Sequence, residues 1–335
     1  MKTLNSKQHS DLAIVIPAYK GKYFQETLYS LSRQTCKQFT VYVGDDFSPD
    51  NLRAICDQFK NEFRIVFYRF QENYGRQSLA KHWTRCVKLS NEPWIWLFSD
   101  DDIADPICVE EFYKTLKVSN GDVNVYRFNN RIINGNDEII HDGNSIPQIE
   151  SAIDYAIARM NSSRKSFVTD HIFSREAFNK NGGFIEFPTG FASDDASWIA
   201  MSHGKEIYTL SGGVVSWRLS SDNISGVENK YGKEKLEAMI KYIAWSKQYF
   251  SEIDKVPAAK YQQLMQSSKM WLTKNILHLR YYISSGELVK ISGELSVIWQ
   301  EKYYISIARL IIIKFIVCIL NISQFNKNKM VLSLQ

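Results

Sequence analysis

The 335-residue sequence has no run rich in proline, glycine or serine, and its 16 glycines and 7 prolines are scattered. That absence argues against a disordered tail. The five cysteines form no CxxC or Cys/His pattern, so a structural zinc site is not expected. Their odd number and irregular spacing suit reduced thiols in the cytoplasm.

A concentrated positive charge is also missing. The net charge is +5, from 41 Lys and Arg against 36 Asp and Glu, and the basic residues are spread along the chain. This distribution argues against nucleic-acid binding but permits attraction to anionic substrates or an anionic lipid surface. Residues 1–11 contain no apolar segment, so no signal peptide is expected.

One long apolar stretch, Tyr303–Ile322, lies near the C-terminus. Arg309 and Lys314 interrupt it, which disfavours a membrane-spanning helix. On a helical wheel its polar residues share one side and a broad apolar face lies opposite, as in helices that lie in a membrane interface. A helix packed on the rest of the protein fits equally well, and both interpretations stay open.

The first hundred residues do contain a regular alternation. Short apolar runs predict four strands, and apolar residues at helical spacing predict three helices between them. The strands are expected at 12–16, 39–43, 64–68 and 94–98, and the helices at 23–35, 52–59 and 79–87. This order indicates a parallel sheet with right-handed crossovers, which binds ligands at the carboxyl ends of its strands.

The pattern becomes less regular after about residue 120. We expect strands at 123–128, 167–173, 206–210 and 214–217, helices at 149–160 and 194–203, a short helix opened by Ser174, and a hairpin turn at Asn134-Gly135. Beyond residue 226 only helical periodicity remains, at 228–250, 258–284 and 289–322. The sequence therefore predicts an α/β domain over 1–225 and a helical region over 226–335.

The most informative segment is the apolar strand that ends in Asp100, Asp101 and Asp102. Three adjacent carboxylates repel one another, and a cation offsets that repulsion. Mn²⁺ and Mg²⁺ prefer oxygen ligands and are commonly shared between one or two carboxylates and substrate phosphates. We therefore predict a divalent-metal site here, although an acidic loop or a helix N-terminus would explain one of the three.

Two weaker motifs follow other strands. Asp45-Asp46 closes the second strand, where a carboxylate can accept hydrogen bonds from a base or ribose, and Ser48 or Asp50 is expected to cap the next helix. In the segment 73–76, a glycine permits an unusual backbone conformation and an arginine can hold a phosphate or base.

Two further motifs lie in the second half of the domain. Asp194 and Asp195 begin a predicted helix, where a carboxylate can act as a general base or Asp194 can simply cap the helix. Arg218 follows Trp217 and can meet a pyrophosphate, or it can extend over the indole ring at the surface.

Taken in order, these segments resemble the family 2 glycosyltransferases with the GT-A fold. The resemblance covers roughly residues 11–225 and is carried by Ile14–Tyr19, Gln34–Ser48, Asn73–Gly75, Ser99–Asp102, Gly182–Phe184 and Asp194-Asp195. It implies a Rossmann-like mixed sheet flanked by helices. It also implies inverting transfer of a sugar from a nucleoside-diphosphate donor, UDP being favoured, with Mn²⁺ or Mg²⁺ as cofactor.

The resemblance further implies roles for individual residues. Asp102, together with Asp100, would hold the metal. Asp195 would be the catalytic base, with Asp194 as the alternative. The nucleotide would be bound by Pro17, Ala18, Tyr19, Asp46, Asn73, Gly75, Arg76, Asp100, Asp101 and Arg218, with Asp100 near the ribose.

The sequence departs from the family pattern at three places. Phe47 stands where glycine is usual, so the turn after Asp46 is expected to differ. Asp194 stands where glutamate is usual, which leaves the choice of base open. The histidine that many relatives carry after the arginine is absent, so either Asp222 replaces it or the dependence on metal is weaker.

The implied biology is transfer of a hexosyl or N-acetylhexosaminyl group to a saccharide or lipid-linked acceptor in surface polysaccharide synthesis. The acceptor site is expected between Asn129 and Thr189. The protein is expected in the cytoplasm, with peripheral contact to the inner membrane face through 303–322. A metal-dependent nucleotidyltransferase and a non-catalytic nucleotide- or saccharide-binding protein are the alternatives, and turnover of a nucleotide sugar separates them.

Overall fold

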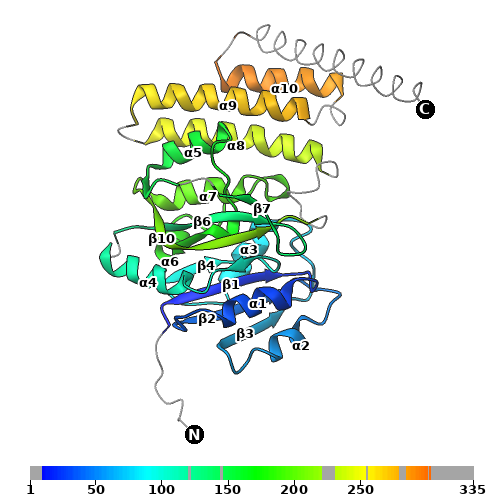
Figure 1. The fold of residues 1–335 in the computed structure, drawn as a ribbon. Coiled ribbons are helices and arrows are strands. Elements are labelled where there is room, and N and C mark those ends of the chain that lie inside the picture. Colours follow the sequence, from blue (N-terminus) through cyan, green and yellow to red (C-terminus); the bar gives the residue numbers. More distant parts are fainter. Residues whose placement is uncertain are drawn as a thin grey trace, which may run out of the picture. The chain divides into compact units, whose positions relative to one another are not determined.

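The computed structural model describes residues 10–119, 122–143, 146–220, 231–253, 256–278, 284–300 and 302. The predicted interfacial segment 303–322 and the possible metal ligand Asp222 lie outside these residues. Contacts within the chain divide it into two compact units, Met1–Gly226 and Val227–Gln335. Figure 1 shows the strands in the first unit.

The described strands of the first unit form one mixed sheet (Figure 1). Along its main path the order is β3-β2-β1-β4-β9-β6-β10-β5, while β7 pairs with β6 and β8 with β10. The bounds are β1 Leu12–Ala18, β2 Phe39–Asp45, β3 Arg64–Arg69, β4 Trp94–Leu97, β5 Ile103–Ala104, β6 Val125–Ile133, β7 Ile139–Asp142, β8 Ile149–Glu150, β9 His171–Ser174 and β10 Ile207–Arg218. The first four strands are parallel, as predicted, and β9 runs antiparallel to β4 and β6.

Helices cover both faces of this sheet. Their bounds are α1 Phe24–Ser32, α2 Leu52–Asp57, α3 Leu79–Val87, α4 Cys108–Val118, α5 Ala152–Met160, α6 Arg175–Lys180 and α7 Ser193–Ser202. In β1, Ile14 and Ile16 share one core with α1, α2 and α4. The alternate residues Ala13 and Val15 are fully buried as well, since α3 lies near β1, β2 and β4. Burial on two faces explains why β1 is apolar throughout.

Several predicted elements have different bounds in the structure. The expected helix 149–160 begins at Ala152, because 149–150 forms β8 beside β10. The expected strand 167–173 begins with a 3₁₀ turn, Val168–Asp170. The two strands at 206–210 and 214–217 are one strand, β10, whose register shifts between Thr209 and Val214.

Two predicted helix caps have different outcomes. Asn51 caps α2 by accepting a hydrogen bond from the Ala54 amide, so the prediction of Ser48 or Asp50 was wrong. Ser174 opens α6, as predicted, and its hydroxyl accepts a hydrogen bond from the Ala177 amide at 3.1 Å.

The second unit, in its described residues, contains helices α8 Gly232–Glu252, α9 Ala258–His278 and α10 Ser285–Ile298. Apolar side chains from all three are buried, among them Ile243, Leu272 and Leu295. None of the helices described for this chain combines the length and the hydropathy needed to cross a membrane.

Candidate active site

The carboxyl ends of β1, β2 and β4 lie side by side in the sheet. The register pairs Ala18 with Asp45 across β1 and β2, and Val15 with Leu97 across β1 and β4. The residues that follow these strands therefore meet at one edge, where parallel α/β sheets bind ligands. Ala18 is buried and ends β1, while the next side chain, Tyr19, is 43% exposed.

Asp46 is held by the loop that precedes α3. Its two carboxylate oxygens accept hydrogen bonds from the amides of Tyr74 and Gly75, each at 2.8 Å, and Arg85 forms an ion pair with it. A Cβ on Gly75 would lie 2.7 Å from Asp46 Oδ2, so the absence of a side chain permits this approach. Asp46 is only 3% exposed, and it binds the loop rather than standing free for a base.

The rest of that loop faces outward. Asn73 Oδ1 accepts a hydrogen bond from the amide of Arg76 at 2.9 Å, which closes a turn. The side chain of Arg76 is exposed. Pro17 is the partly buried residue of β1 that pairs with Gly44 in β2.

The turn after Asp46 keeps a glycine-like backbone although Phe47 occupies it. Phe47 has φ 59°, in the left-handed region, and its ring is 52% exposed. The guanidinium of Arg69 lies 5.1 Å from the ring centre, while Arg69 Nη1 contacts Asp45 Oδ2 at 2.6 Å. Phe47 therefore holds a backbone conformation that favours glycine.

Asp100 joins the ends of β1 and β4. Its Oδ2 accepts hydrogen bonds from the amides of Tyr19 and Lys20 at 2.7 and 2.8 Å. Burial raises the pKa of Asp100 to about 6, with a further rise from Asp101, against the lowering effect of the Lys20 ammonium and the two amides.

Asp101 contacts a cation that sequence analysis missed. Lys20 Nζ lies 2.6 Å from Asp101 Oδ2 and 3.8 Å from Asp100 Oδ1. Burial disfavours the charge of Lys20, but the carboxylates of Asp100 and Asp101 outweigh burial and raise its pKa. The sequence does carry a signal for this contact. Lys20 follows β1, and the three carboxylates follow β4, the strand that pairs with β1.

Asp102 is the most deeply buried of the three carboxylates, with no exposed surface. Its Oδ1 accepts a hydrogen bond from the Arg218 amide at 2.8 Å, and Oδ2 has no hydrogen-bond partner in the described part of the chain. Burial, and then the charge of Asp101, raise the pKa of Asp102 well above its usual range. A buried carboxylate oxygen without a partner is costly unless a ligand completes it.

Arg218 supports this acidic segment from β10. Its Nε donates to the carbonyl of Asp101 at 2.8 Å, and Nη1 contacts Asp137 Oδ1 at 2.6 Å. The guanidinium lies 4.3 Å from the ring centre of Tyr23, and the side chain is only 1% exposed. The alternative of a surface arginine over Trp217 was wrong.

The two carboxylates at the start of α7 have different surroundings. Asp195 is 4% exposed, and Arg159 binds both its oxygens, Nε to Oδ1 at 2.8 Å and Nη2 to Oδ2 at 2.9 Å. The Tyr155 hydroxyl donates to Asp195 Oδ1 at 2.6 Å. Tyr155 and Arg159 lie one turn apart on α5, a spacing that puts both on one helix face.

Asp194 has no such ion pair among the described residues. Burial and the neighbouring charge of Asp195 raise its pKa to about 7, against Arg159 and backbone hydrogen bonds, which lower it. Ala192 occupies the N-cap position of α7 with φ 58°, so the expectation of capping by Asp194 was wrong. A carboxylate with a pKa near 7 suits proton transfer at physiological pH.

Asp170 is a further buried carboxylate that the sequence did not single out. It precedes β9, the strand between β4 and β6 in the sheet. Its Oδ2 accepts hydrogen bonds from Asn130 Nδ2 at 2.7 Å and the Phe167 amide at 2.9 Å. Burial raises its pKa to about 8. Its charge acts on Asp102, and the charge of Asp194 acts on it, so these three groups share one electrostatic environment.

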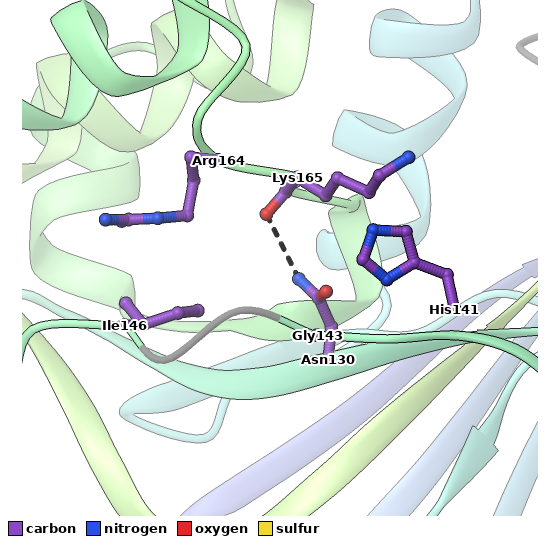
Figure 2. A pocket seen from close by; sticks show the side chains of 6 residues that line it. All are labelled: Asn130, His141, Gly143, Ile146, Arg164 and Lys165. Atoms are coloured by element: carbon purple, nitrogen blue, oxygen red, sulfur yellow. Dashed lines mark hydrogen bonds between the residues drawn. The ribbon is translucent and has the colours of Figure 1, made fainter.

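A small cavity lies on the other side of Asn130 (Figure 2). Asn130 donates to the carbonyl of Lys165 at 3.2 Å, and His141 and Arg164 also line the space. Its volume of about 10 Å³ is room for roughly one water molecule. The cavity is therefore too small to hold a sugar ring.

The residues present fit a divalent cation held by one protein carboxylate. The unpartnered Oδ2 of Asp102 supplies an oxygen ligand, whereas Asp100 and Asp101 are engaged by amides and by Lys20. Within the described ranges no three acidic, histidine or cysteine side chains converge on one point. Donor phosphates and water would have to complete the coordination, as is common for Mg²⁺.

Comparison with known proteins identifies the family. The model of glycosyl transferase family 2 matches residues 13–181, and the chain belongs to this family. It is 27% identical over 194 residues to the glycosyltransferase GlyG of Streptococcus pneumoniae, which covers 55% of this chain and 62% of GlyG. It is 31% identical over 133 residues to a chondroitin synthase of Escherichia coli, covering 37% of this chain and 19% of the synthase. The chain thus spans less than two thirds of these curated relatives.

Solved structures show the same fold. Staphylococcus aureus TarS 1-349 in complex with UDP-GlcNAc aligns with a TM-score of 0.64 at 16% identity, covering 86% of this chain and 80% of that one. A mannosyltransferase from Pyrobaculum calidifontis in complex with GDP-Man and Mn²⁺ aligns with a TM-score of 0.52 at 14% identity, covering 90% and 86%. The predicted GT-A class, a mixed α/β sheet with helices beyond it, is confirmed.

Proposed function

We propose that this protein transfers a sugar from a nucleoside-diphosphate donor, a UDP-sugar above all, to a hydroxyl group of an acceptor, with inversion at the anomeric carbon. Membership of the family and the gathering of Asp46, Asp100 and Asp102 at one sheet edge support this proposal. The carrying observation is the different surroundings of two neighbouring carboxylates: Arg159 fixes Asp195 through an ion pair, whereas burial and the charge of Asp195 raise the pKa of Asp194 to about 7.

Asp194 is the better general base of the two. The carboxylate of Asp195 accepts three hydrogen bonds from Arg159 and Tyr155, and these contacts hold it in place. The pKa of Asp194, about 7, balances the fraction deprotonated against the strength of the base. Asp195 then acts as a positioning residue that fixes the first turn of α7.

The reaction has one bond made and one broken. The acceptor oxygen attacks the anomeric carbon from the face opposite the diphosphate, and the bond between that carbon and the diphosphate oxygen breaks. Asp194 takes the hydroxyl proton, and the nucleoside diphosphate leaves with the bonding electrons. The fixed edge supplies orientation, which contributes a large part of such rate enhancements.

The nucleotide is proposed to lie over the ends of β1 and β2, against Ala18, Tyr19 and the loop held by Asp46. Asp100 fixes the backbone of that surface through the Tyr19 and Lys20 amides. A divalent cation held by Asp102, Mn²⁺ or Mg²⁺, would offset the charge that develops on the leaving diphosphate.

Family membership and the sequence beyond the described residues support a proposal for the cellular role. We propose a saccharide or lipid-linked acceptor in surface polysaccharide synthesis, with hexosyl or N-acetylhexosaminyl transfer. Peripheral contact with the cytoplasmic face of the membrane is proposed for 303–322, where an apolar face opposes Arg309 and Lys314.

A thermal-shift panel with UDP, GDP, CMP and ADP, each with Mn²⁺ and with EDTA, tests the donor class. A ligand at about 100 times its Kd stabilises the folded state by roughly 2.7 kcal/mol. We expect the largest shift with UDP and Mn²⁺, and a screen of UDP-sugars for turnover should follow. A shift with GDP or CMP instead would change the donor, and no shift with any nucleotide would contradict the proposal.

A further inference from the structure

The acidic segment Asp100–Asp102 already contacts a positive charge supplied by the chain itself. Lys20 follows β1, and its ammonium reaches across to β4, with Nζ 2.6 Å from Asp101 Oδ2 and 3.8 Å from Asp100 Oδ1. The two carboxylates are 7% and 8% exposed, whereas the Lys20 side chain is 32% exposed. The Lys20 side chain is therefore more accessible to solvent than the two carboxylates that it contacts.

Backbone contacts fix the position of Lys20. Its amide donates to Asp100 Oδ2 at 2.8 Å, and the amide of Tyr19 donates to the same oxygen. The carbonyl of Tyr19 accepts a hydrogen bond from the Ser48 hydroxyl at 2.6 Å. The side chain thus begins at a fixed point beside its carboxylate partners, and a substitution of the side chain alone leaves this backbone frame intact.

We propose that Lys20 is the resident counter-ion of the acidic segment, a positioning residue that weakens binding of free divalent metal and keeps the segment able to accept a donor diphosphate when no metal is present. This proposal rests on the proposed function for its diphosphate half only. Lys20 interacts electrostatically with Asp102 as well as with Asp100 and Asp101, so its charge would repel a cation bound at Asp102 Oδ2. A diphosphate meets an ammonium with three N–H donors, of which Asp101 takes one.

Manganese titration without nucleotide tests the metal half. The electron paramagnetic resonance signal of free Mn²⁺ decreases as the ion binds, and this decrease is measured with the original protein and with Lys20→Met. We expect Lys20→Met to bind Mn²⁺ at least about tenfold more tightly, since the neighbouring positive charge is gone. Lys20→Arg keeps the charge and should match the original protein, as should the matched control Lys22→Met, two residues away.

A second variant protects the test against misfolding. Lys20→Gln retains an N–H donor for Asp101 without the charge, and it should tighten Mn²⁺ binding as Lys20→Met does. Adding Asp102→Asn to either variant should remove the gained binding, which places the metal at Asp102. Unchanged Mn²⁺ affinity in folded Lys20→Met or Lys20→Gln, or a gain that Asp102→Asn leaves intact, would overturn the proposal.

Binding of UDP in the presence of EDTA tests the diphosphate half. Lys20→Met should weaken it at least about tenfold, and Lys20→Arg should restore it. Equal UDP affinity in Lys20→Met and the original protein would refute this half. A chain that binds no UDP under any condition would overturn the proposed function instead, while the Mn²⁺ titration would still decide the role of Lys20.

Discussion

Asp194→Asn should lower the transfer rate without lowering the Tm, whereas Asp195→Asn should lower the Tm. Asp194→Asn removes the proposed base but no ion pair of the described chain. We expect the transfer rate at saturating substrate to fall by about 10²–10⁴, the range for loss of a general base. Donor affinity should stay unchanged, because the donor surface is built on β1, β2 and β4.

Asp195→Asn breaks the two-point contact with Arg159 and leaves a cation without its partner. Breaking a buried ion pair costs about 3–5 kcal/mol, and the lower value applies because the Arg159 side chain is 23% exposed. A loss of about 3 kcal/mol would lower the Tm by roughly 6–12 °C in a unit of this size. Lys in place of Arg159 is the matched control, since it keeps the charge but not the two-point geometry.

The transfer rate and the stability should also depend on pH, and in opposite directions. Transfer requires ionised Asp194, so the rate should rise with pH and level off above about 7. Stability should change in the other direction. The folded state holds the Asp194 proton more tightly than the unfolded chain does, so this contribution is full below the usual pKa of 3.8 and is lost as pH rises through about 7. Asp194→Asn should therefore not lower the Tm at pH 7.

The assays are transfer from a UDP-sugar and thermal unfolding, each on both variants. A well-folded Asp195→Asn protein with an unchanged Tm and a rate lowered a thousandfold or so, beside an active Asp194→Asn protein, would refute this reasoning. It would return the role of base to Asp195.

Further substitutions test other parts of the structure. Gly75→Ala places a Cβ 2.7 Å from Asp46 Oδ2 and should lower the free energy of unfolding by about 1–3 kcal/mol; an unchanged urea midpoint would contradict this. Phe47→Gly should be more stable than Phe47→Ala by about 1 kcal/mol in the same assay, because only glycine adopts the left-handed turn without strain. Asp102→Asn should remove the part of UDP binding that depends on Mn²⁺, and equal affinities would rule out the metal assignment. Deleting 303–335 should release the protein from sedimented lipid vesicles, whereas a truncated chain that still sediments would disprove that anchor.

The strands β1, β2 and β4 could be predicted from sequence because they are buried on both faces. Continuous apolar runs such as Leu12–Ile16 and Trp94–Phe98 are sufficient to place strands, and the alternation with helices fixes their order. The acidic segment Asp100–Asp102 comes directly after the last of these strands. Sequence pattern and structure agree here because the residues within each element are sufficient to predict it.

The secondary structure after about residue 120 depends on contacts between residues that are distant in the sequence. Ile149–Glu150 becomes a strand only because Ile207 and Tyr208 of β10 pair with it. The two strands expected around the glycines at 212–213 are one, since Gly213, with φ 78°, makes an irregularity against Cys108 rather than a turn. No local pattern reports either contact.

The partners of the site carboxylates were missed for the same reason. Arg159 lies 36 residues before Asp195, and Lys20 lies 81 residues before Asp101. Spacing within a motif identifies which carboxylates gather but not which cations bind them. The sequence therefore predicted an acidic edge, and the structure adds the basic residues that decide how each carboxylate behaves.

The contacts that α5 makes with Asp195 have a consequence for exchanging surface segments of this fold. Tyr155 and Arg159 hold Asp195 from inside the fold, whereas the exposed hairpin between β6 and β7 reaches the acidic segment through Asp137, which pairs with Arg218. A hairpin transplanted from a relative should therefore leave Asp195 aligned, and it should keep an acidic residue at position 137 so that Arg218 stays in place beside Asp101.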